Sequence, residues 1–377
     1  MIDPMRISLI APLAKAKAAP PSGDRTVLAE LIRALELAGH EVEFERTLRT
    51  YARKPSEHVV LKFAANAHAQ RLIRKLARTP PDLVLCYHNY YRAPDWIGPR
   101  VAAAIRRPYV VVEASHAAKR LSGEWAASAA DALAALQSAA AVFTMTPRDR
   151  AGLAKIVPPD RLHDLPPFLD ARPFKPWRDK RDTARASLAS RLNAGLSSPV
   201  IAACAMMREG KKHESYRQLF AALEHLRDVP WTLLIAGDGP LRGEIESMAA
   251  TFAPRVHFMG ELAPDAIPEF FSSCDLHLWP GLNEAYGMVY LEAAAAARPS
   301  LAYRSGGVAS VLRAGETGVL VPEGDVPALG TALRALLADP AARERLGQSA
   351  AEFVDRERTT AHAAAILRPV LEKVTRL

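Results

Sequence analysis

The stretch DLHLWPGLNEAYGMVYLEAAAAARPSLAYRS, residues 275–305, contains a strand, a loop, a helix and a second strand in that order. The short apolar runs DLHLWP (275–280) and PSLAYRS (299–305) are typical of buried strands. Between them, NEAYGMVYLEAAAAARP (283–299) begins with loop residues and continues as an alanine-rich helix. Two strands joined by a helix form a βαβ unit, so this stretch predicts a parallel sheet.

The same alternation of strand-like and helix-like segments extends over the rest of the chain. In the first half, the strand-like runs are RISLIAP (6–12), EVEFERT (41–47), DLVLCYH (82–88), PYVVVEAS (108–115) and AAVFTMT (140–146). In the second half, they also include PVIAACAM (199–206), WTLLIAG (231–237), RVHFMG (255–260) and GVLVP (318–322). We therefore predict an α/β protein of two Rossmann-like, doubly wound parallel-sheet domains that face each other across a cleft.

The domain boundary is predicted where this pattern weakens. The segment LPPFLDARPFKPWRDK (165–180) is rich in proline and charge. We place an N-terminal domain at 1–170 and a C-terminal domain at 171–355. A final helix at 356–377 is expected to pack back on the N-terminal domain.

The composition is that of a globular protein. Of the 377 residues, 49% are apolar and 24% are charged, which excludes a disordered or fibrous chain. No uncharged apolar run is long enough to span a bilayer, and the N-terminus lacks the features of a signal peptide, so we expect a cytoplasmic protein. Cys86, Cys204 and Cys274 lie far apart in apolar stretches, and we interpret all three as core residues.

The positive charge is concentrated in the first half. Residues 1–170 contain 24 basic and 17 acidic residues, which accounts for +7 of the net charge of +8. This excess indicates an anionic partner, such as a membrane surface, a phosphate-bearing substrate or nucleic acid.

Two glutamates give the 283–299 stretch its chemistry. Glu284 falls in the predicted loop, and Glu292 falls in the first turns of the helix. Gly287 lets the backbone approach a ligand, and the N–H groups of Met288 and Val289 lie at the helix N-terminus, where a diphosphate is favoured. The Glu292 carboxylate could accept hydrogen bonds from a ribose diol, and the Glu284 carboxylate could bind hydroxyls of a sugar. The alternative is that Glu292 is a solvated helix residue and Glu284 a capping acid.

This pattern resembles the Glu-x7-Glu signature of the retaining family-four glycosyltransferases, which have the GT-B fold. Further segments that resemble this family are PPSGDRTVLAELIRALELAGHEVEF (20–44), MMREGKKHESYRQLFAAL (206–223), LLIAGDGPLRGEIE (233–246) and RSGGVASVLRAGETGVLVPEGD (304–325). The resemblance covers almost the whole chain and is looser in the N-terminal half. It implies that the N-terminal domain binds an acceptor and that the C-terminal domain binds a nucleotide-sugar donor.

The resemblance also assigns roles in the C-terminal half. Glu292 corresponds to the acid that binds the ribose, and Glu284 to the acid beside the transferred sugar. The backbone of Ala285, Tyr286 and Gly287 would then lie near the hydroxyls of that sugar.

A basic pair on the diphosphate is implied at Arg208 and Lys212. Negative charge develops on this leaving group as the glycosidic bond breaks, and cations stabilise it. The register departs from the family, because the sequence here is Arg208-Glu-Gly-Lys-Lys-His, and Lys211 can take the place of Lys212.

In the N-terminal half, the resemblance implicates His116 and Gly23. His116 follows the fourth predicted strand, where the family often has a histidine near the anomeric centre. The alternative is a loop histidine bonded to backbone. Gly23 lies in the first glycine-rich loop, which contains Gly-Asp here in place of the usual glycine pair. His88, with Asn89, Tyr90 and Tyr91, is expected to line the acceptor site.

The implied reaction is transfer of a sugar, with retention, from a nucleotide-diphosphate sugar to a glycan, lipid-linked or small-molecule acceptor. The chain contains no Asp-x-Asp motif, the usual metal-holding motif of the other large glycosyltransferase class, so we expect neither a metal nor a cofactor other than the donor substrate. Other GT-B enzymes, such as a sugar-nucleotide epimerase or a phosphorylase-like enzyme, are alternatives. A non-catalytic nucleotide-sugar-binding protein is another.

One motif suggests a different class. GDGPLRG (237–243) resembles a dinucleotide-binding glycine turn, and Glu261 follows about 20 residues later, where a dehydrogenase binds the ribose. The spacing differs by one residue from the standard fingerprint. An NAD-dependent oxidoreductase is therefore a minor alternative.

The basic segment RLIRKLAR (71–78) separates its residue types at helical spacing. Arg71, Arg74, Lys75 and Arg78 share one face, and Leu72, Ile73 and Leu76 share another. This pattern is typical of an ordinary surface helix. It also allows peripheral docking on an anionic membrane, whereas no recognition motif supports nucleic-acid binding.

Overall fold

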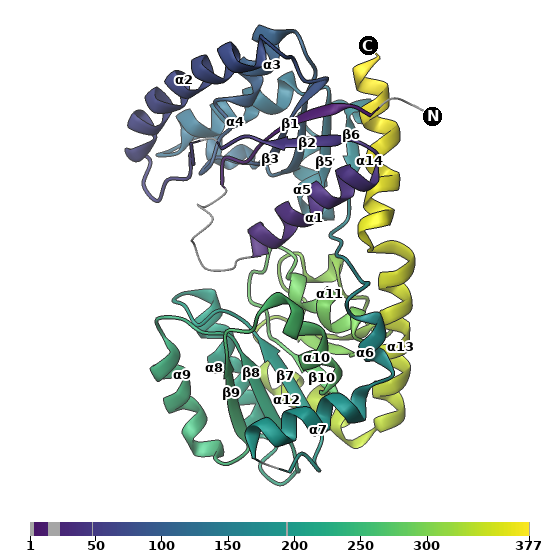
Figure 1. The fold of residues 1–377 in the computed structure, drawn as a ribbon. Coiled ribbons are helices and arrows are strands. Elements are labelled where there is room, and N and C mark those ends of the chain that lie inside the picture. Colours follow the sequence, from purple (N-terminus) through teal and green to yellow (C-terminus); the bar gives the residue numbers. More distant parts are fainter. Residues whose placement is uncertain (1–3, 14–22, 47, 194, 377) are drawn as a thin grey trace. The chain divides into compact units, whose positions relative to one another are not determined.

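The computed structural model describes residues 4–13, 23–46, 48–193 and 195–376. The chain forms two compact units, one made of residues 1–166 and 360–377 and the other of residues 167–359. Each unit contains its own parallel sheet, which confirms the predicted fold class (Figure 1).

The sheet of the N-terminal unit has the strand order β2–β1–β3–β4–β5–β6 within the described residues. Its strands are β1 (Arg6–Ile10), β2 (Glu41–Phe44), β3 (Leu83–Asn89), β4 (Tyr109–Ala114), β5 (Ala141–Thr144) and β6 (Leu162–Asp164). The helices of this unit are α1 (Gly23–Leu37), α2 (Glu57–Leu76), α3 (Gly98–Ile105), α4 (Ala126–Ser138), α5 (Pro147–Leu153) and α14 (Thr360–Thr375).

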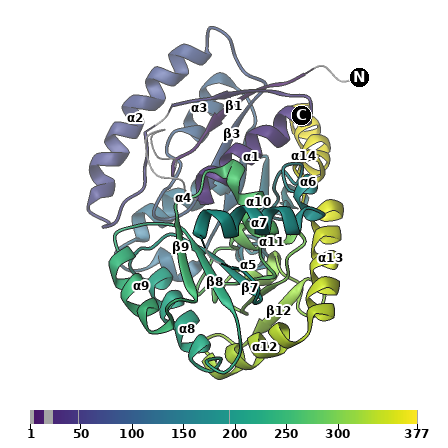
Figure 2. The same ribbon diagram turned by 60° about the horizontal axis from the view of Figure 1, so that its bottom comes forward.

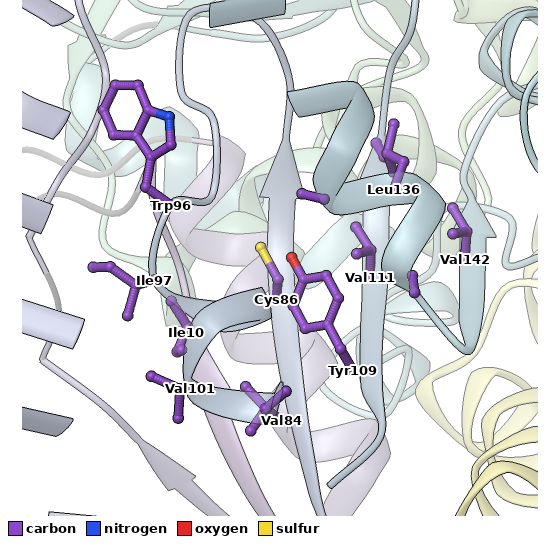
Figure 3. Packing of buried hydrophobic residues seen from close by; sticks show 14 of the residues in the cluster. Ile10, Val84, Cys86, Trp96, Ile97, Val101, Tyr109, Val111, Leu136 and Val142 are labelled. Carbon is purple, nitrogen blue, oxygen red and sulfur yellow. The ribbon is translucent and has the colours of Figure 1, made fainter. Parts of the chain in front are cut away.

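The central strands of this sheet consist of almost uninterrupted buried residues, because helices cover both faces of a parallel sheet. On one face, the side chains of Val84, Cys86 and Val111 pack against residues of α3 and α4, including Val101 and Leu136 (Figure 3). Each fully buried aliphatic side chain of this kind contributes roughly 1.5–3 kcal/mol. This core fixes where the strands end.

The C-terminal unit has the strand order β12–β11–β10–β7–β8–β9 within the described residues. Its strands are β7 (Val200–Cys204), β8 (Thr232–Ala236), β9 (Val256–Gly260), β10 (Leu276–Leu278), β11 (Ser300–Tyr303) and β12 (Gly318–Val321). Its helices are α6 (Lys175–Arg178), α7 (Arg181–Leu192), α8 (Lys211–Glu224), α9 (Arg242–Ala249), α10 (Ile267–Ser272), α11 (Met288–Ala295), α12 (Val326–Ala338) and α13 (Pro340–Glu357). In Figures 1 and 2, α9 and α13 flank opposite edges of this unit.

Short polar residues set the beginnings of the last helices of this unit. Asp325 precedes α12, and its carboxylate accepts a hydrogen bond of 2.9 Å from the backbone N–H of Ala328. Asp339 precedes α13 and binds the N–H of Ala342 in the same way. Such caps satisfy N–H groups that have no partner inside the helix.

The chain returns to the N-terminal unit at its last helix. α14 packs on α1, the Arg368 side chain donates a hydrogen bond of 2.8 Å to the carbonyl of Ala38, and Thr360 binds Glu30. The units divide at 166/167 and 359/360, a few residues from the boundaries predicted at 170/171 and 355/356. The second predicted boundary falls within the last turn of α13.

Two of the three cysteines have the predicted core environment. Cys86 and Cys274 are buried, but Cys204 is only partly buried, because it ends β7 at the edge where the loops of the sheet begin. The described part of the chain contains no helix with the length and apolarity needed to cross a membrane.

Candidate functional site

The strand order of the C-terminal unit creates a topological switch point between β7 and β10. The chain continues from β7 to β8 on one side and from β10 to β11 on the other. The loops that leave these two strands therefore diverge, and ligands of doubly wound sheets bind in the resulting crevice. Arg208 and Lys212 follow β7, and Glu284 follows β10, so the predicted donor residues belong to these two connections.

Lys212 and Glu284 meet at this point. The Lys212 ammonium group contacts Oε1 of Glu284, and both side chains are largely buried. The Trp279 indole N–H donates a hydrogen bond of 3.1 Å to the same oxygen, and the ammonium group lies 5.3 Å from the centroid of the Trp279 ring. Glu284 is thus held by two donors from different elements. We call Lys212, Trp279, Glu284, Glu292 and the N-terminus of α11 the switch-point site.

The loop that carries Glu284 is fixed by its neighbours. Its backbone N–H groups at Leu282 and Asn283 donate to the hydroxyls of Ser215 and Ser305 at 3.2 and 2.7 Å. The carbonyl of Glu284 accepts a hydrogen bond of 2.9 Å from the N–H of Gly307. Contacts to α8 and to the loop after β11 therefore hold this segment in place.

Two glycines are required by this geometry. Gly287 has a φ of +77°, and a Cβ there would lie 2.6 Å from the Tyr290 ring. Gly306 has a φ of +54°, and its Cβ would lie 2.1 Å from the Glu284 carbonyl oxygen. An L side chain at either position would be strained and would displace the loop.

The N-terminus of α11 follows this loop directly. Met288 and Val289 are its first residues, so their N–H groups precede the first hydrogen bonds within the helix. Ala285 is exposed beside them, whereas Tyr286 is buried and anchors the loop. The helix N-terminus carries partial positive charge and points out of the carboxyl edge of the sheet.

Glu292 lies on α11, close to the end of β7. Burial raises the pKa of its carboxyl group to about 7. Burial, together with the neighbouring Glu292 carboxylate, raises the pKa of the Cys204 thiol to about 12. Glu292 is therefore not a solvated surface residue, which excludes that alternative. A carboxylate that is costly to bury alone is well placed to accept hydrogen bonds from a bound ligand.

The three basic residues between the end of β7 and the first turn of α8 have different environments. Lys212 belongs to the switch-point site, whereas Lys211, its neighbour on α8, is exposed. Arg208 is also exposed, in the loop before α8, and makes no hydrogen bond or ion pair with another described residue. Only Lys212 of the predicted basic pair is brought into contact with Glu284.

The glycine turn after β8 has a packing explanation. A Cβ on Gly237 would lie 2.0 Å from the carbonyl oxygen of Ala205, and one on Gly239 would lie 2.3 Å from that of Met207. Asp238 pairs with Arg242 of the same turn at 3.1 Å. These glycines allow two neighbouring loops to pack, so the turn by itself does not indicate a dinucleotide.

The predicted residues of the N-terminal unit lie at the carboxyl edge of its own sheet. His116 follows β4 and is partly buried, which lowers the pKa of its imidazole. Its carbonyl packs on α5, where a Cβ at Gly152 would lie 2.5 Å from the oxygen. Gly23 is exposed and begins α1, after the connection from β1.

Two further residues at this edge share an unusual backbone conformation. His88, the last residue but one of β3, has a φ of +72°, and Glu113, the last residue but one of β4, has a φ of +58°. Their neighbours are in register, and the His88 Nδ1 atom lies 3.8 Å from Oε1 of Glu113. Strain in two adjacent non-glycine residues is typical of functional sites. Glu113 is not predictable as a site residue, since no sequence signal marks a glutamate with a left-handed backbone.

The three residues predicted to line the acceptor site with His88 have different environments. Asn89 is buried and structural, because its side chain binds the Ala132 carbonyl and the N–H of Asp95 at 3.0 Å each, so its predicted place in the acceptor site is wrong. Tyr90 and Tyr91 remain partly exposed, and the Tyr90 ring lies 4.9 Å from His88.

Fold and geometry together define a protein of two Rossmann-like units with a candidate site for an anionic ligand at a switch point. Residues 198–339 match the family described as glycosyl transferases group 1. The C-terminal unit therefore carries a group 1 glycosyl transferase domain, and the chain has the GT-B fold, as its motifs predicted.

Individual relatives and structures agree with this assignment. The chain is 32% identical over 222 residues to alpha-D-kanosaminyltransferase of Streptomyces kanamyceticus, across 58% of this chain and 56% of that protein. It is 34% identical over 201 residues to a GDP-mannose-dependent alpha-(1-6)-phosphatidylinositol monomannoside mannosyltransferase of Mycolicibacterium smegmatis, across 50% of each chain. The chain thus spans about half the length of these curated relatives.

Among solved structures, HepE of Anabaena in complex with UDP-glucose has the same fold. The TM-score is 0.71 at 16% sequence identity, and the match covers 99% of this chain and 100% of that one. This similarity extends over both units.

Proposed function

We propose that this protein is a retaining family-four glycosyltransferase that moves a sugar from a nucleotide-diphosphate donor to an acceptor. The contact between Lys212 and Glu284 beside the N-terminus of α11 carries this proposal, because it unites one cation, one carboxylate and free N–H donors at the switch point. A nucleotide sugar needs all three, since its diphosphate is anionic and its sugar carries hydroxyls.

Each group of the switch-point site has a role in this reaction. The N–H groups of Met288 and Val289 and the ammonium of Lys212 stabilise the charge that develops on the departing diphosphate. Arg208, exposed in the loop between β7 and α8, supplies a second cation in this proposal. Glu292 accepts hydrogen bonds from the ribose, and Glu284, with the backbone of Ala285, binds the transferred sugar.

The N-terminal unit supplies the acceptor side in this proposal. His116 and the pair His88 and Glu113 lie at the carboxyl edge of its sheet, where a polar acceptor would be recognised. No side chain of the switch-point site is proposed as a covalent nucleophile. Retention then follows from attack on the same face as the departing phosphate, which takes the acceptor proton.

The comparisons support a nucleotide sugar as donor. The mannosyltransferase relative is named as dependent on GDP-mannose, and the HepE structure contains UDP-glucose. Both donors are nucleotide-diphosphate sugars. For the acceptor, the named relatives include enzymes that act on a phosphatidylinositol mannoside and on a D-inositol 3-phosphate.

A two-stage experiment tests the proposed function. Thermal unfolding in the presence of a panel of nucleotide sugars identifies the donor, because a ligand that binds only the folded state raises the Tm. The stabilising donor is then incubated with acceptor mixtures, and release of nucleoside diphosphate is measured together with the anomeric configuration of the product by NMR. Release that depends on acceptor, with retained configuration, is the expected result.

Other outcomes distinguish the alternatives. Conversion of the nucleotide sugar without nucleotide release identifies an epimerase. Glycosidic cleavage by inorganic phosphate alone identifies a phosphorylase-like enzyme. A Tm shift without transfer or hydrolysis identifies a binding protein, and hydride transfer to NAD an oxidoreductase.

Metal independence is tested in the same assay. Full activity in excess EDTA is expected, because Lys212, Arg208 and the helix N-terminus provide the positive charge. Loss of transfer on chelation that magnesium or manganese restores would contradict this part of the proposal.

A further inference from the structure

Helix α2 exposes large apolar side chains to solvent. Val59, Val60 and Phe63 are 76%, 72% and 78% exposed, more than any other large apolar residue among the exposed ones described. They lie on the first turns of a 20-residue helix that borders the N-terminal unit (Figure 1). Single exposed apolar residues are normal on a protein surface, but large apolar side chains exposed next to one another mark an interaction site.

These residues are not needed to hold α2 in place. The opposite face of the helix buries Ala65, Ala69, Leu72 and Leu76 in the core of the unit. This confirms the apolar face predicted for the end of the helix. α2 therefore has two apolar regions, and only one of them packs against the protein.

The exposed face changes character along the helix. At 100° per residue, Val59, Phe63, Gln70 and Arg74 form one stripe, and Val60, Ala67 and Arg71 form the next. The two stripes cover an arc of about 120°. The first half of this exposed face is apolar, and the second half is basic.

The basic half is available for an external partner. Arg71 and Arg74, with Arg78 just beyond the helix, are exposed and form no ion pair with another described residue. Lys75 differs from them, because its ammonium group binds the Glu43 and Glu45 carboxylates at 2.7 and 2.9 Å. The four-residue basic face predicted from the sequence is therefore reduced to three arginines.

We propose that the exposed face of α2 docks in the plane of an anionic lipid bilayer. Val59, Val60 and Phe63 enter the boundary between head groups and acyl chains, and Arg71, Arg74 and Arg78 bind lipid phosphates. An amphipathic helix with apolar and arginine residues on one exposed surface has the composition of an interfacial helix. The net charge of +7 on residues 1–170 complements the same anionic surface. This inference does not depend on the transfer reaction.

The basic half and the apolar half of the exposed face of α2 contribute to membrane binding through different interactions. Each arginine near an anionic surface strengthens binding by roughly fivefold, so three arginines give about a hundredfold. Burial of three apolar side chains adds binding that salt does not screen. Neither half alone gives stable attachment, and together they give reversible peripheral binding.

Flotation of the full-length protein with vesicles tests the proposal. The vesicles contain either phosphatidylcholine alone or phosphatidylcholine with 30% phosphatidylglycerol, a composition chosen at roughly the anionic content at which polybasic segments bind. Wild type should bind only the anionic vesicles. The variant Arg71→Gln/Arg74→Gln/Arg78→Gln should bind about 100-fold more weakly. The variant Val59→Ser/Val60→Ser/Phe63→Ser should lose at least about tenfold and become fully salt-sensitive.

A matched control removes the same charge elsewhere. Arg107, Arg148 and Lys155 are exposed residues of the N-terminal unit outside α2, and their triple Gln variant should bind as wild type does. Far-UV circular dichroism and thermal unfolding of each variant check that these exposed substitutions leave the fold intact.

Several results would overturn the proposal. Absence of wild-type binding to anionic vesicles is one, and equal loss in the α2 and control arginine variants is another. Unchanged binding of the serine variant would restrict the contact to charge and refute insertion. Concentration-dependent self-association that Phe63→Ser abolishes, without vesicle binding, would assign the face to a second copy of the chain.

Discussion

The ammonium group of Lys212 contacts the carboxylate of Glu284, although 72 residues separate them in the sequence. The contact joins the first turn of α8 to the loop before α11, across the switch point of the C-terminal sheet. In the proposed reaction the donor diphosphate would compete with Glu284 for this cation.

Lys212→Met should lower kcat by roughly 10²–10³-fold, the effect of removing one preorganised group that stabilises transition-state charge. Steady-state release of nucleoside diphosphate measures it. Lys211→Met is the matched control, since Lys211 is exposed on the same helix, and its kcat should stay within about threefold of wild type. Equal losses in the two variants would contradict the assignment of Lys212, and not Lys211, to the switch-point site.

Glu284→Gln should separate binding from turnover. The substitution keeps an acceptor for the Trp279 indole but removes the negative charge beside Lys212. Calorimetry should therefore give an equal or tighter Kd for the nucleoside diphosphate, while turnover of the nucleotide sugar falls. A weaker Kd for the diphosphate, with turnover unchanged, would contradict the placement of Glu284 beside the sugar.

Glu292→Gln should weaken donor binding, because a charged hydrogen-bond acceptor for the ribose contributes about 1.5–3 kcal/mol. This corresponds to a Kd raised roughly 10- to 150-fold, measured by calorimetry at pH 8. In wild type, donor affinity should rise with pH through about 7, where the Glu292 carboxyl group ionises. The Gln variant should lack this pH dependence.

Ionisation of Glu292 should strengthen donor binding but lower the stability of the free protein. The pKa of Glu292 is 4.5 in an unfolded chain and about 7 when folded. Between these pH values the unfolded chain has lost a proton that the folded protein still binds, so the free energy of unfolding falls as pH rises and levels off above 7. Glu292→Gln should therefore have the wild-type Tm at pH 4 and a higher Tm at pH 8.

Much of this architecture is predictable because parallel sheets leave strong signals. The runs 6–12 and 199–206 contain β1 and β7, and the run 82–88 includes all of β3 except its last residue. The helix N-terminus after Gly287 follows from local sequence too. Motifs predict both Glu284 and Lys212 as site residues, but the contact between them depends on the strand order, which periodicity alone does not give.

The features that the sequence does not predict are tertiary contacts. Trp279 donates a hydrogen bond to Glu284. In the sequence it belongs to the strand-like run 275–280, and in the structure it immediately follows β10. Asn89 looks like a site residue by position, but Asp95 and Ala132 bind its amide in the core. Lys75 matches the arginines of its helix in the sequence, yet β2 brings two carboxylates to it. Each outcome depends on a partner distant in the chain.

His88 and Glu113 of the N-terminal unit have left-handed backbone conformations near the ends of two neighbouring strands. Such a conformation costs an L residue roughly 1–2 kcal/mol. Such strain in two adjacent residues favours a role in binding over a role in folding. His88→Gln and Glu113→Gln should therefore raise the KM for acceptor at least about tenfold, as expected when a buried polar contact is lost, and leave donor affinity unchanged.

A second set of variants separates strain from function. Glu113→Gly relieves the backbone and should keep the wild-type Tm or raise it, while acceptor KM rises as in Glu113→Gln. Arg106→Gly is the matched control, because Arg106 ends α3 with a φ of +54° and is exposed. It should change the Tm in the same direction without changing KM for either substrate. If Glu113→Gly and Arg106→Gly behave alike in both assays, the conformation of Glu113 is structural and the acceptor site lies elsewhere.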